Sequence, residues 1–235
     1  MAAARRQLAD VTRVAGVTRA TDVTRAASAA RARPAGERIR HPPEVRRALI
    51  VEAARSVIAD RGLFATTMRD IAAASEVSLG TVTYHFRGIA EILAEVLDGE
   101  MDAFYAPLIA TAFAQPDGRA ALGALIDGFL ASSPRTRQHW VLWLDFWALS
   151  AHDGEYARRQ AVFYQRWQRD VEAVFECGVA DGSLRVEAID EAVAEFTAVF
   201  DGMASKAYLP GAGIRPAEAR SRLHRYVDRI PGNSA

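Results

Sequence analysis

The chain has 235 residues, of which half are hydrophobic and a quarter charged, and its 29 basic and 29 acidic side chains cancel at pH 7. These proportions are ordinary for a globular chain with one large or two small domains. The single cysteine, Cys177, excludes an intrachain disulfide and a thiolate-rich zinc site, and no run approaches the ~18 consecutive apolar residues of a membrane span. We therefore expect a cytoplasmic protein that does not enter a membrane.

The first 42 residues form a basic segment with few large apolar side chains. They hold nine arginines against Asp10, Asp22 and Glu37, a net charge of +6. Such a segment cannot bury enough apolar surface to offset the entropy of ordering, which predicts a mobile basic arm. Its interpretation stays open between a solvated tail without a partner and an arm that contacts nucleic acid. The arginine-rich, acid-poor composition also resembles a transit peptide.

Signals of short helices begin at Pro43. An apolar stripe followed by Gly62 predicts a first helix with a left-handed glycine cap, the stripe being Ile50, Ala54, Val57 and Ile58. Thr66 or Thr67 can cap a second helix, and Asp70 suits its positive end. Residues 75–77 form a predicted tight turn, after which Ser78 caps a third short helix that runs to about residue 85.

The rest of the chain predicts helix after helix. A long fourth helix starts at Ile89, and Pro107 should kink or end it. Further helices are expected at 119–132, 136–151, 155–177, 188–207 and after Pro216. No alternating strand pattern appears, so the predicted fold class is all-α. Apolar side chains recur at steps of four and three along 189–203 and 219–230, and we expect these stripes to form the faces of a homodimer.

Three short helices with a three-residue turn between the second and third describe a helix-turn-helix. The outward face of the third helix contains no carboxylate that would repel phosphate. Its hydroxyl, phenol and imidazole groups can reach phosphates or base edges, and its residues are Ser78, Gly80, Thr81, Thr83, Tyr84 and His85.

The stretches Thr66–Ala72 and Val77–Phe86 resemble the DNA-binding signature of tetracycline-repressor (TetR) family regulators, which spans about 45 residues. Weaker similarities to the ligand domain of the BetI-type branch lie at 140–147, 178–185 and 200–203. The resemblance implies a helix-turn-helix headpiece followed by a helical domain that binds an inducer and forms a homodimer. It places the DNA contacts at Thr66, Thr67, Arg69, Ser78, Gly80, Thr81, Thr83, Tyr84 and His85.

Three positions depart from the family pattern. Ile89 replaces the usual phosphate-gripping lysine, and Thr83 replaces an aromatic residue. Ser75-Glu76 replaces the usual Ala-Gly, and because glutamate tolerates a left-handed backbone poorly, we expect the turn to differ slightly. Residues 44–93 also hold six arginines against six acidic residues, so the headpiece is not basic and the +6 arm could supply the missing attraction for phosphate.

Large aromatic side chains gather on two neighbouring predicted helices in the second domain. Such rings at helical spacing are more often core than pocket, but their number favours an effector cavity lined by Trp143, Phe146, Trp147, Phe163, Tyr164 and Trp167. The expected effector is an apolar or aromatic small molecule, with a cationic one as an alternative. Asp145 could pair with an arginine or face such a cation.

The sequence contains no motif of an enzyme. His139, His152 and His224 lack the spacing of metal ligands, Cys177 has no histidine neighbour, and no nucleophile elbow or phosphate-binding glycine loop is present. We expect neither a cofactor nor a metal. The predicted domains are the arm at 1–42, the headpiece at 43–88 and the ligand-binding and dimerisation domain at 89–235. The predicted function is a ligand-responsive repressor that binds double-stranded operator DNA as a homodimer; the alternative is an all-helical enzyme or small-molecule carrier.

Overall fold

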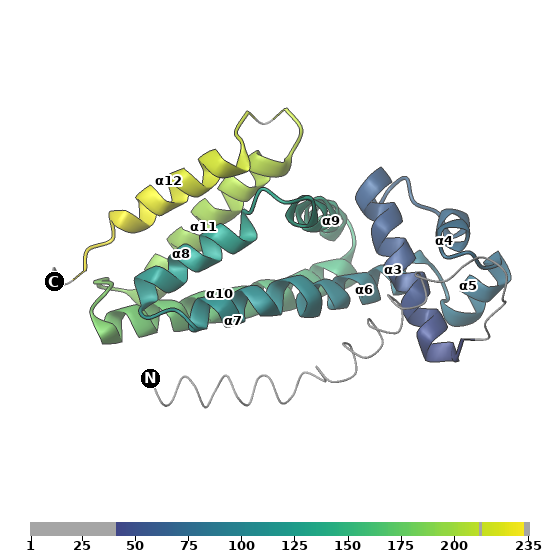
Figure 1. Ribbon diagram of the computed structural model, residues 1–235, viewed down its shortest axis with the longest axis horizontal. Coiled ribbons are helices and arrows are strands. Elements are labelled where there is room, and N and C mark those ends of the chain that lie inside the picture. Colours follow the sequence, from purple (N-terminus) through teal and green to yellow (C-terminus); the bar gives the residue numbers. More distant parts are fainter. Residues whose placement is uncertain (1–40, 212, 233–235) are drawn as a thin grey trace. The chain divides into compact units, whose positions relative to one another are not determined.

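The structure, a computed structural model, describes residues 41–211 and 213–232. Within these ranges the chain is built from helices and contains no strand, which confirms the predicted all-α fold (Figure 1). The chain divides into two compact units after Asp102. The predicted arm lies outside the described residues apart from its last two positions. No helix in the described part of the chain is long and apolar enough to cross a membrane.

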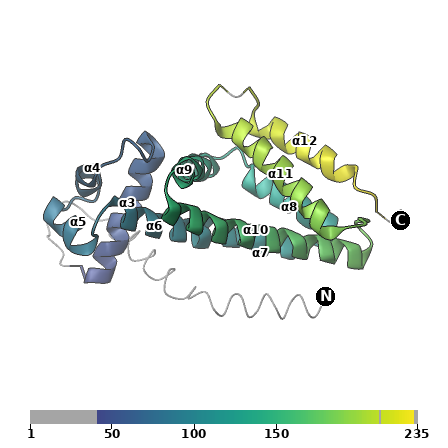
Figure 2. The ribbon, with the colours of Figure 1, turned by 180° about the vertical axis from the view of Figure 1, so that it is seen from behind.

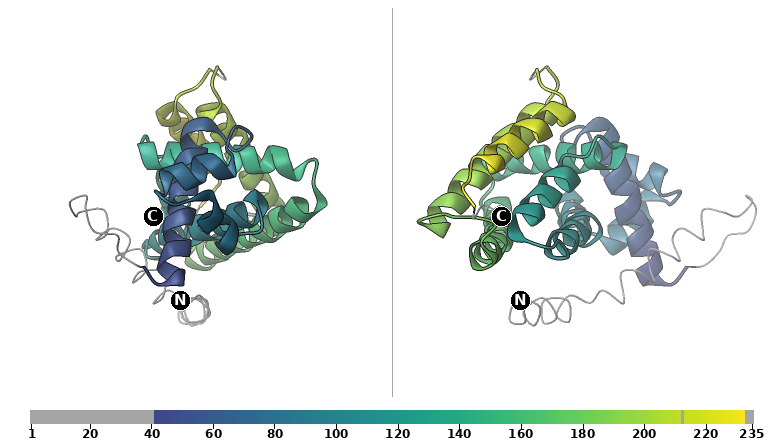
Figure 3. Two further views of the ribbon diagram at one scale, coloured as in Figure 1. Left: turned by 90° about the vertical axis from the view of Figure 1, so that its right-hand side faces the viewer. Right: turned by 60° about the vertical axis from the view of Figure 1, so that its left-hand side comes forward.

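The described part of the first unit contains the helices α3 (Pro43–Arg61), α4 (Met68–Ala74), α5 (Leu79–His85) and α6 (Ile89–Glu100). Helix α3 packs against both α4 and α6, and α4 packs against α5 (Figure 3, left). The unit extends past residue 88, the predicted boundary, because the apolar side of α6 packs against α3. The buried apolar side chains of α6 are Ile92, Leu93, Val96 and Leu97.

Gly62 ends α3 as predicted, but in a different conformation. Its φ of 81° is combined with a ψ of 157°, so the residue is extended and does not form the left-handed cap that the sequence suggested. Its N–H still donates to the Ile58 carbonyl at 2.8 Å. This combination of angles is open essentially to glycine alone, which explains why a glycine is needed where the chain turns from α3 toward α4.

Pro107 neither ends the long fourth helix nor leaves it regular. Helix α6 continues through a π-helical turn, Met101–Tyr105, into α7 (Ala106–Phe113), and Pro107 lies in the first turn of α7. Proline has no N–H for the bond to the preceding turn, and a wider π-turn relieves the clash of its ring with that turn. The predicted interruption is therefore present as a local change of helix type.

The second unit continues with α8 (Gly118–Phe129), α9 (Pro134–Ser150), α10 (Gly154–Asp181), α11 (Ile189–Tyr208) and α12 (Pro216–Asp228). Helices α8 and α11 lie between α10 and α12 (Figures 1 and 2). Helix α9 packs against α10 and α11, and α12, in yellow, runs beside α11, in green (Figure 3, right). The core between these helices is rich in rings, with Phe129, Phe175, Phe196 and Phe200 almost fully buried.

The glycine-containing stretch that resembles the BetI branch has a structural role. A Cβ on Gly118 would lie 2.3 Å from the Cα of Gly178, so α8 and α10 approach too closely for any side chain at this crossing. Gly182 takes the left-handed conformation that caps α10, with φ 80° and ψ 3°. The chain then turns back so that Leu184 N–H donates to the Gly178 carbonyl at 2.9 Å.

Part of each apolar stripe expected at the dimer face is buried inside the chain. Val193, Phe196 and Phe200 of α11 and Leu223 of α12 are at most 6% exposed, because α11 packs on α9, α10 and α12, and α12 packs on α8. The other large apolar members of the stripes are half-buried, namely Ile189, Met203, Tyr226 and Ile230. The part that these residues play in a dimer stays a prediction.

Candidate DNA-binding and ligand-binding sites

A capping box fixes the start of α4. The Thr67 hydroxyl accepts from the Asp70 N–H at 3.2 Å, and Asp70 Oδ2 accepts from the Thr67 N–H at 2.9 Å. The pKa of Asp70 lies below its usual value because its carboxylate accepts from the Thr67 hydroxyl at 2.6 Å and from the Thr67 N–H, and because Arg61 lies 2.9 Å away. Thr67 and Arg69 are exposed beside this cap.

Thr66 is a correction to the predicted DNA-contacting set. Its side chain is only 6% exposed, and its hydroxyl donates to the Gly62 carbonyl at 2.8 Å. The residue closes the turn between α3 and α4 and does not present its hydroxyl to a partner. The motif match could not separate the two adjacent threonines, because their orientations depend on the turn.

Helix α5 presents most of its predicted polar residues outward. Ser78, Gly80, Thr83 and Tyr84 are exposed, while Thr81 and His85 are half-buried. Tyr84 extends furthest, at 81% exposure, and its ring meets that of His85 edge to face, with centroids 5.1 Å apart. A Cβ on Gly80 would meet only Ser78 Oγ, at 3.7 Å, so the chain itself leaves room for a side chain there. This open space at Gly80 would allow the backbone of a bound partner to approach the helix closely.

Hydrogen bonds within α5 orient its hydroxyl groups. Ser78 Oγ caps the helix by accepting from the Thr81 N–H at 3.1 Å, and it lies 2.9 Å from Thr81 Oγ1. Thr83 Oγ1 donates back to the carbonyls of Leu79 and Gly80, both at 3.2 Å. The oxygen of each hydroxyl keeps free lone pairs toward solvent, and Tyr84 is the most accessible polar group of the face.

The turn between α4 and α5 keeps a left-handed residue even though the sequence offers no glycine. Glu76 has φ 54°, which contradicts the expectation that the glutamate would alter the turn. The N–H of Val77 donates to the Ala72 carbonyl at 3.0 Å, and the Ser75 hydroxyl donates to the Ile71 carbonyl at 2.6 Å. These bonds hold the turn, so Glu76 adopts the strained conformation that the usual glycine would take without cost.

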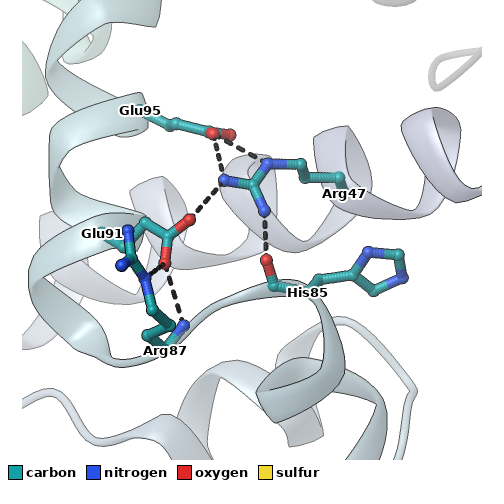
Figure 4. A network of polar contacts seen from close by, with 5 residues as sticks. All are labelled: Arg47, His85, Arg87, Glu91 and Glu95. Atoms are coloured by element: carbon teal, nitrogen blue, oxygen red, sulfur yellow. Dashed lines mark hydrogen bonds and ion pairs between the residues drawn. The ribbon is translucent and has the colours of Figure 1, made fainter.

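A polar network centred on Arg47 connects three helices of the first unit (Figure 4). From α3, Arg47 donates to the carbonyl of His85 at the end of α5. It also bonds Glu91 at 2.9 Å and Glu95 at 2.8 Å on α6. Its guanidinium lies 4.0 Å above the ring of Phe86. Arg47 thereby fixes the end of the predicted recognition helix to α3 and α6, a role that the sequence gave no local signal for.

Glu91 receives bonds from two arginines. The backbone N–H of Arg87, at 2.9 Å, and then the Arg47 side chain lower the pKa of Glu91 to about 2. With Asp70 and Glu52, it is one of several carboxylates of the stretch 44–93 that pair with arginines of the unit. The neutral charge count of the headpiece therefore includes acids that are paired internally.

The six predicted ligand-binding residues lie in four different surroundings. Trp143, Phe146 and Phe163 contact one another, with centroids 5.5 to 6.1 Å apart, and Phe146 is fully buried. Trp167, 8% exposed, belongs to a separate core cluster with Phe129 and Phe200. Trp147 lies beside Trp140, and Tyr164 bonds Asp201. Phe146 and Trp167 are thus core residues, whereas the other four are half-buried.

Two half-buried carboxylates each accept a bond from a tyrosine. Tyr164 donates to Asp201 at 2.6 Å, and Tyr105 donates to Asp170 at 2.6 Å. Burial raises the pKa of Asp201 to about 6 and also raises the pKa of Asp170. Arg166 lies 4.0 Å from Asp170. Asp201 belongs to the 200–203 motif, but its partner is 37 positions away, so the pair had no signal in the sequence.

An open groove of about 550 Å³ lies between α7 and α8. It is lined by Leu108, Thr111, Gln115, Ala120, Gly123, Ala124, Asp127 and Gly128. None of the predicted ligand-binding residues contributes to it. The aromatic residues of α9 and α10 and this groove are therefore separate features of the second unit.

Comparisons with known proteins agree with both units. Residues 50–96 match the family described as bacterial regulatory proteins of the tetR family, and residues 118–232 match the C-terminal domain of BetI-type transcriptional repressors. The HTH-type transcriptional regulator BetI 2 of Chromohalobacter salexigens is 28% identical over 190 residues, which cover 79% of this chain and 88% of the relative. The regulator BetI of Burkholderia ambifaria is 26% identical over 188 residues, which cover 80% of this chain and 94% of the relative.

Solved structures give the same picture. A transcriptional regulator from Saccharomonospora viridis, solved in complex with choline, is 25% identical with a TM-score of 0.73, and the match covers 78% of this chain and 95% of that one. A TetR-family regulator from Rhodococcus, 21% identical with a TM-score of 0.69 over 79% of this chain and 98% of that one, shares the fold.

Proposed function

The chain belongs to the TetR family of transcriptional regulators, with a C-terminal domain of the BetI type, and we propose that it acts as a repressor that a small-molecule effector releases from DNA. The family consists of DNA-binding regulators and not of enzymes, so the alternative of an all-helical enzyme or carrier is set aside. The finer parts of the proposal are operator recognition by α5, a homodimeric state and effector binding in the second unit.

The observation that carries the proposal is the exposed polar face of α5. It follows a helix-turn-helix turn, contains no carboxylate between Leu79 and His85, and extends Tyr84 into solvent. Tyrosine, serine and threonine hydroxyls bond phosphates and base edges, and the open space at Gly80 permits close approach of a sugar-phosphate chain.

Operator binding is tested by replacing Tyr84 and His85 together with alanine. Specific binding to the DNA upstream of the protein's own gene should be lost, because the phenol of Tyr84, which extends furthest from α5, and the imidazole of His85 are removed. The His85 carbonyl that bonds Arg47 is part of the backbone and is kept. Val162→Ala, at an exposed position of α10, is the matched control and should bind normally. Unchanged affinity in a folded double variant would contradict the assignment of α5.

A homodimer supports this mode of binding, because one recognition helix reads only half of an inverted repeat. Two copies related by a two-fold axis would place their α5 helices about one turn of B-DNA apart, ~34–36 Å. The half-buried stripe residues of α11 and α12, such as Met203 and Tyr226, stay candidates for the contact between copies. Sedimentation equilibrium measures the state directly, and a monomer that binds a full inverted repeat would contradict the proposal.

A small organic cation is the proposed effector. Half-buried rings on α9 and α10 offer faces for a cation, and a related regulator was solved with choline. Effector binding must favour the form of the protein that is released from DNA over the DNA-bound form by several kcal/mol, up to ~5.5 for a nearly complete switch.

Effector binding should change the intrinsic fluorescence, because tryptophans lie among the predicted contacts. Trp143→Ala should weaken effector binding while leaving operator affinity without effector unchanged. Trp167→Phe, a conservative change in the core cluster, is the matched control and should respond to effector like the natural protein. Equal weakening in both variants would indicate a general effect on folding and not a contact.

A further inference from the structure

Helix α5 lacks the side chains that usually read bases through paired hydrogen bonds. Arginine and lysine bond guanine in this way, and asparagine and glutamine bond adenine, each through two bonds in the major groove. The stretch Leu79–His85 contains none of these four residue types. Any choice among base pairs that α5 makes must therefore rest on single hydrogen bonds or on apolar contacts.

Thr83 uses the hydrogen of its hydroxyl within its own helix. Oγ1 donates to the carbonyl oxygens of Leu79 and Gly80, which both lie 3.2 Å away. Because a hydroxyl has one hydrogen, the side chain has no hydrogen left to donate to a base. The residue is exposed, and its methyl group is the part of the side chain that is not bonded to the helix. Thr83 therefore offers a partner a methyl group and no donor.

Leu79 adds a second apolar side chain on the same side of α5. It precedes Thr83 by four positions, and side chains at this spacing are neighbours, with Cβ atoms about 5–6 Å apart. Leu79 is 38% exposed, whereas Val82 is fully buried. An exposed leucine alone says little. Its position is the informative part, because Leu79 begins α5 and the N-terminal residues of a recognition helix face the base edges.

We propose that Leu79 and Thr83 contact the C5-methyl groups of two neighbouring thymines, so that α5 selects closely spaced A·T pairs in each operator half-site. Thymine presents a methyl group in the major groove, and a threonine methyl group or another apolar side chain contacts it. Side chains about 5–6 Å apart span one to two base-pair steps of about 3.4 Å. This inference rests on the proposed operator recognition by α5 and adds to it the bases that the helix selects.

The exchange of thymine for uracil tests the proposal, because uracil lacks the C5-methyl group but keeps every hydrogen-bonding atom. The full-length protein first selects its preferred sites from a random library of double-stranded DNA. Each thymine of a selected site is then replaced by uracil, one position at a time, and affinity is measured by fluorescence anisotropy. Two neighbouring positions in each half-site should lose about fourfold in affinity, the effect of exposing one methyl group, and other thymines should lose little.

Variants assign each methyl contact to a residue. Leu79→Ala should bind the selected site more weakly and should lose the sensitivity to uracil at one of the two positions. Thr83→Ser keeps the hydroxyl that bonds the helix but removes the methyl group, so it should lose the sensitivity at the other position. Thr83→Val is the matched control, because it removes the hydroxyl and keeps the methyl group. It should remain as sensitive to uracil as the natural protein.

Thermal unfolding verifies that each variant is folded. A selected site that binds equally well with uracil at every position would overturn the proposal, and so would a uracil effect that persists unchanged in both Leu79→Ala and Thr83→Ser. Either result leaves operator recognition by α5 intact, because the selected site is still bound. If the library yields no preferred sequence, operator recognition itself fails, and this inference fails with it.

Discussion

At the scale of single residues, Glu76 combines a non-glycine side chain with a positive φ of 54°. A left-handed conformation costs an L-residue about 1–2 kcal/mol, whereas glycine avoids this cost but loses about 0.5–1 kcal/mol in backbone entropy. Glu76→Gly should therefore raise the free energy of unfolding by about 0.5–1 kcal/mol, measured by urea denaturation.

The matched control is Glu76→Ala, which removes the same carboxylate but keeps a Cβ. It should leave stability within about 0.5 kcal/mol of the natural chain, because the strain remains. If alanine stabilised as much as glycine, the effect would come from the lost charge, and the conformational explanation would be wrong.

Single residues also mark where prediction from the sequence stops. The roles of Thr67 and Ser78 as helix caps followed from local rules, and both are confirmed. Thr66 was misassigned, because only the folded turn directs its hydroxyl to the Gly62 carbonyl. The pairing of Tyr164 with Asp201 joins residues on different helices, and no local pattern reports which helices pack together.

At the scale of elements, the position of α5 depends on Arg47. This side chain bonds the carbonyl at the end of α5 and two glutamates of α6. Arg47→Met keeps an unbranched apolar stem over Phe86 but removes every bond of the guanidinium. Because the group is partly exposed, we expect a loss of about 1–2 kcal/mol in stability and weaker operator binding in the folded protein.

Arg61→Met serves as the comparison for Arg47→Met. Arg61 makes an ion pair with Asp70, but its side chain is 61% exposed, so the change should cost at most about 0.5 kcal/mol. Operator binding is measured at a temperature where both variants are folded. Equal losses for the two variants would show that Arg47 acts as an ordinary surface arginine and does not position α5.

The helices themselves were largely predictable. Apolar periodicity, threonine and serine caps, and the glycine at 182 describe local chemistry, and the observed bounds follow them closely. The π-turn before Pro107 was predicted only as a kink or an end, because proline disturbs a helix without fixing how the chain adapts. The stripes of α11 and α12 proved to be partly core, since a pattern shows that a face is apolar but not which surface covers each of its residues.

At the scale of the whole molecule, charge is distributed unevenly along the chain. The headpiece stretch 44–93 is neutral, and several of its arginines are engaged with carboxylates of the same unit, as Arg47, Arg55 and Arg61 illustrate. Helix α5 has no arginine or lysine of its own. The first 42 residues carry +6, so we expect them to add to the long-range attraction for phosphate.

Deleting residues 1–40 tests whether the arm supplies that attraction. Each phosphate that a protein neutralises contributes about −0.9 to the slope of log affinity against log salt concentration. Removing the arm should flatten this slope and weaken operator and unrelated DNA by a similar factor, because charge alone does not read sequence. A full-length variant with the arginines of the arm replaced by glutamine should behave like the deletion, which separates charge from chain length. If both variants keep the slope and the affinity of the natural protein, the arm does not contact DNA, and the hydroxyl-rich face of α5 must be sufficient for binding.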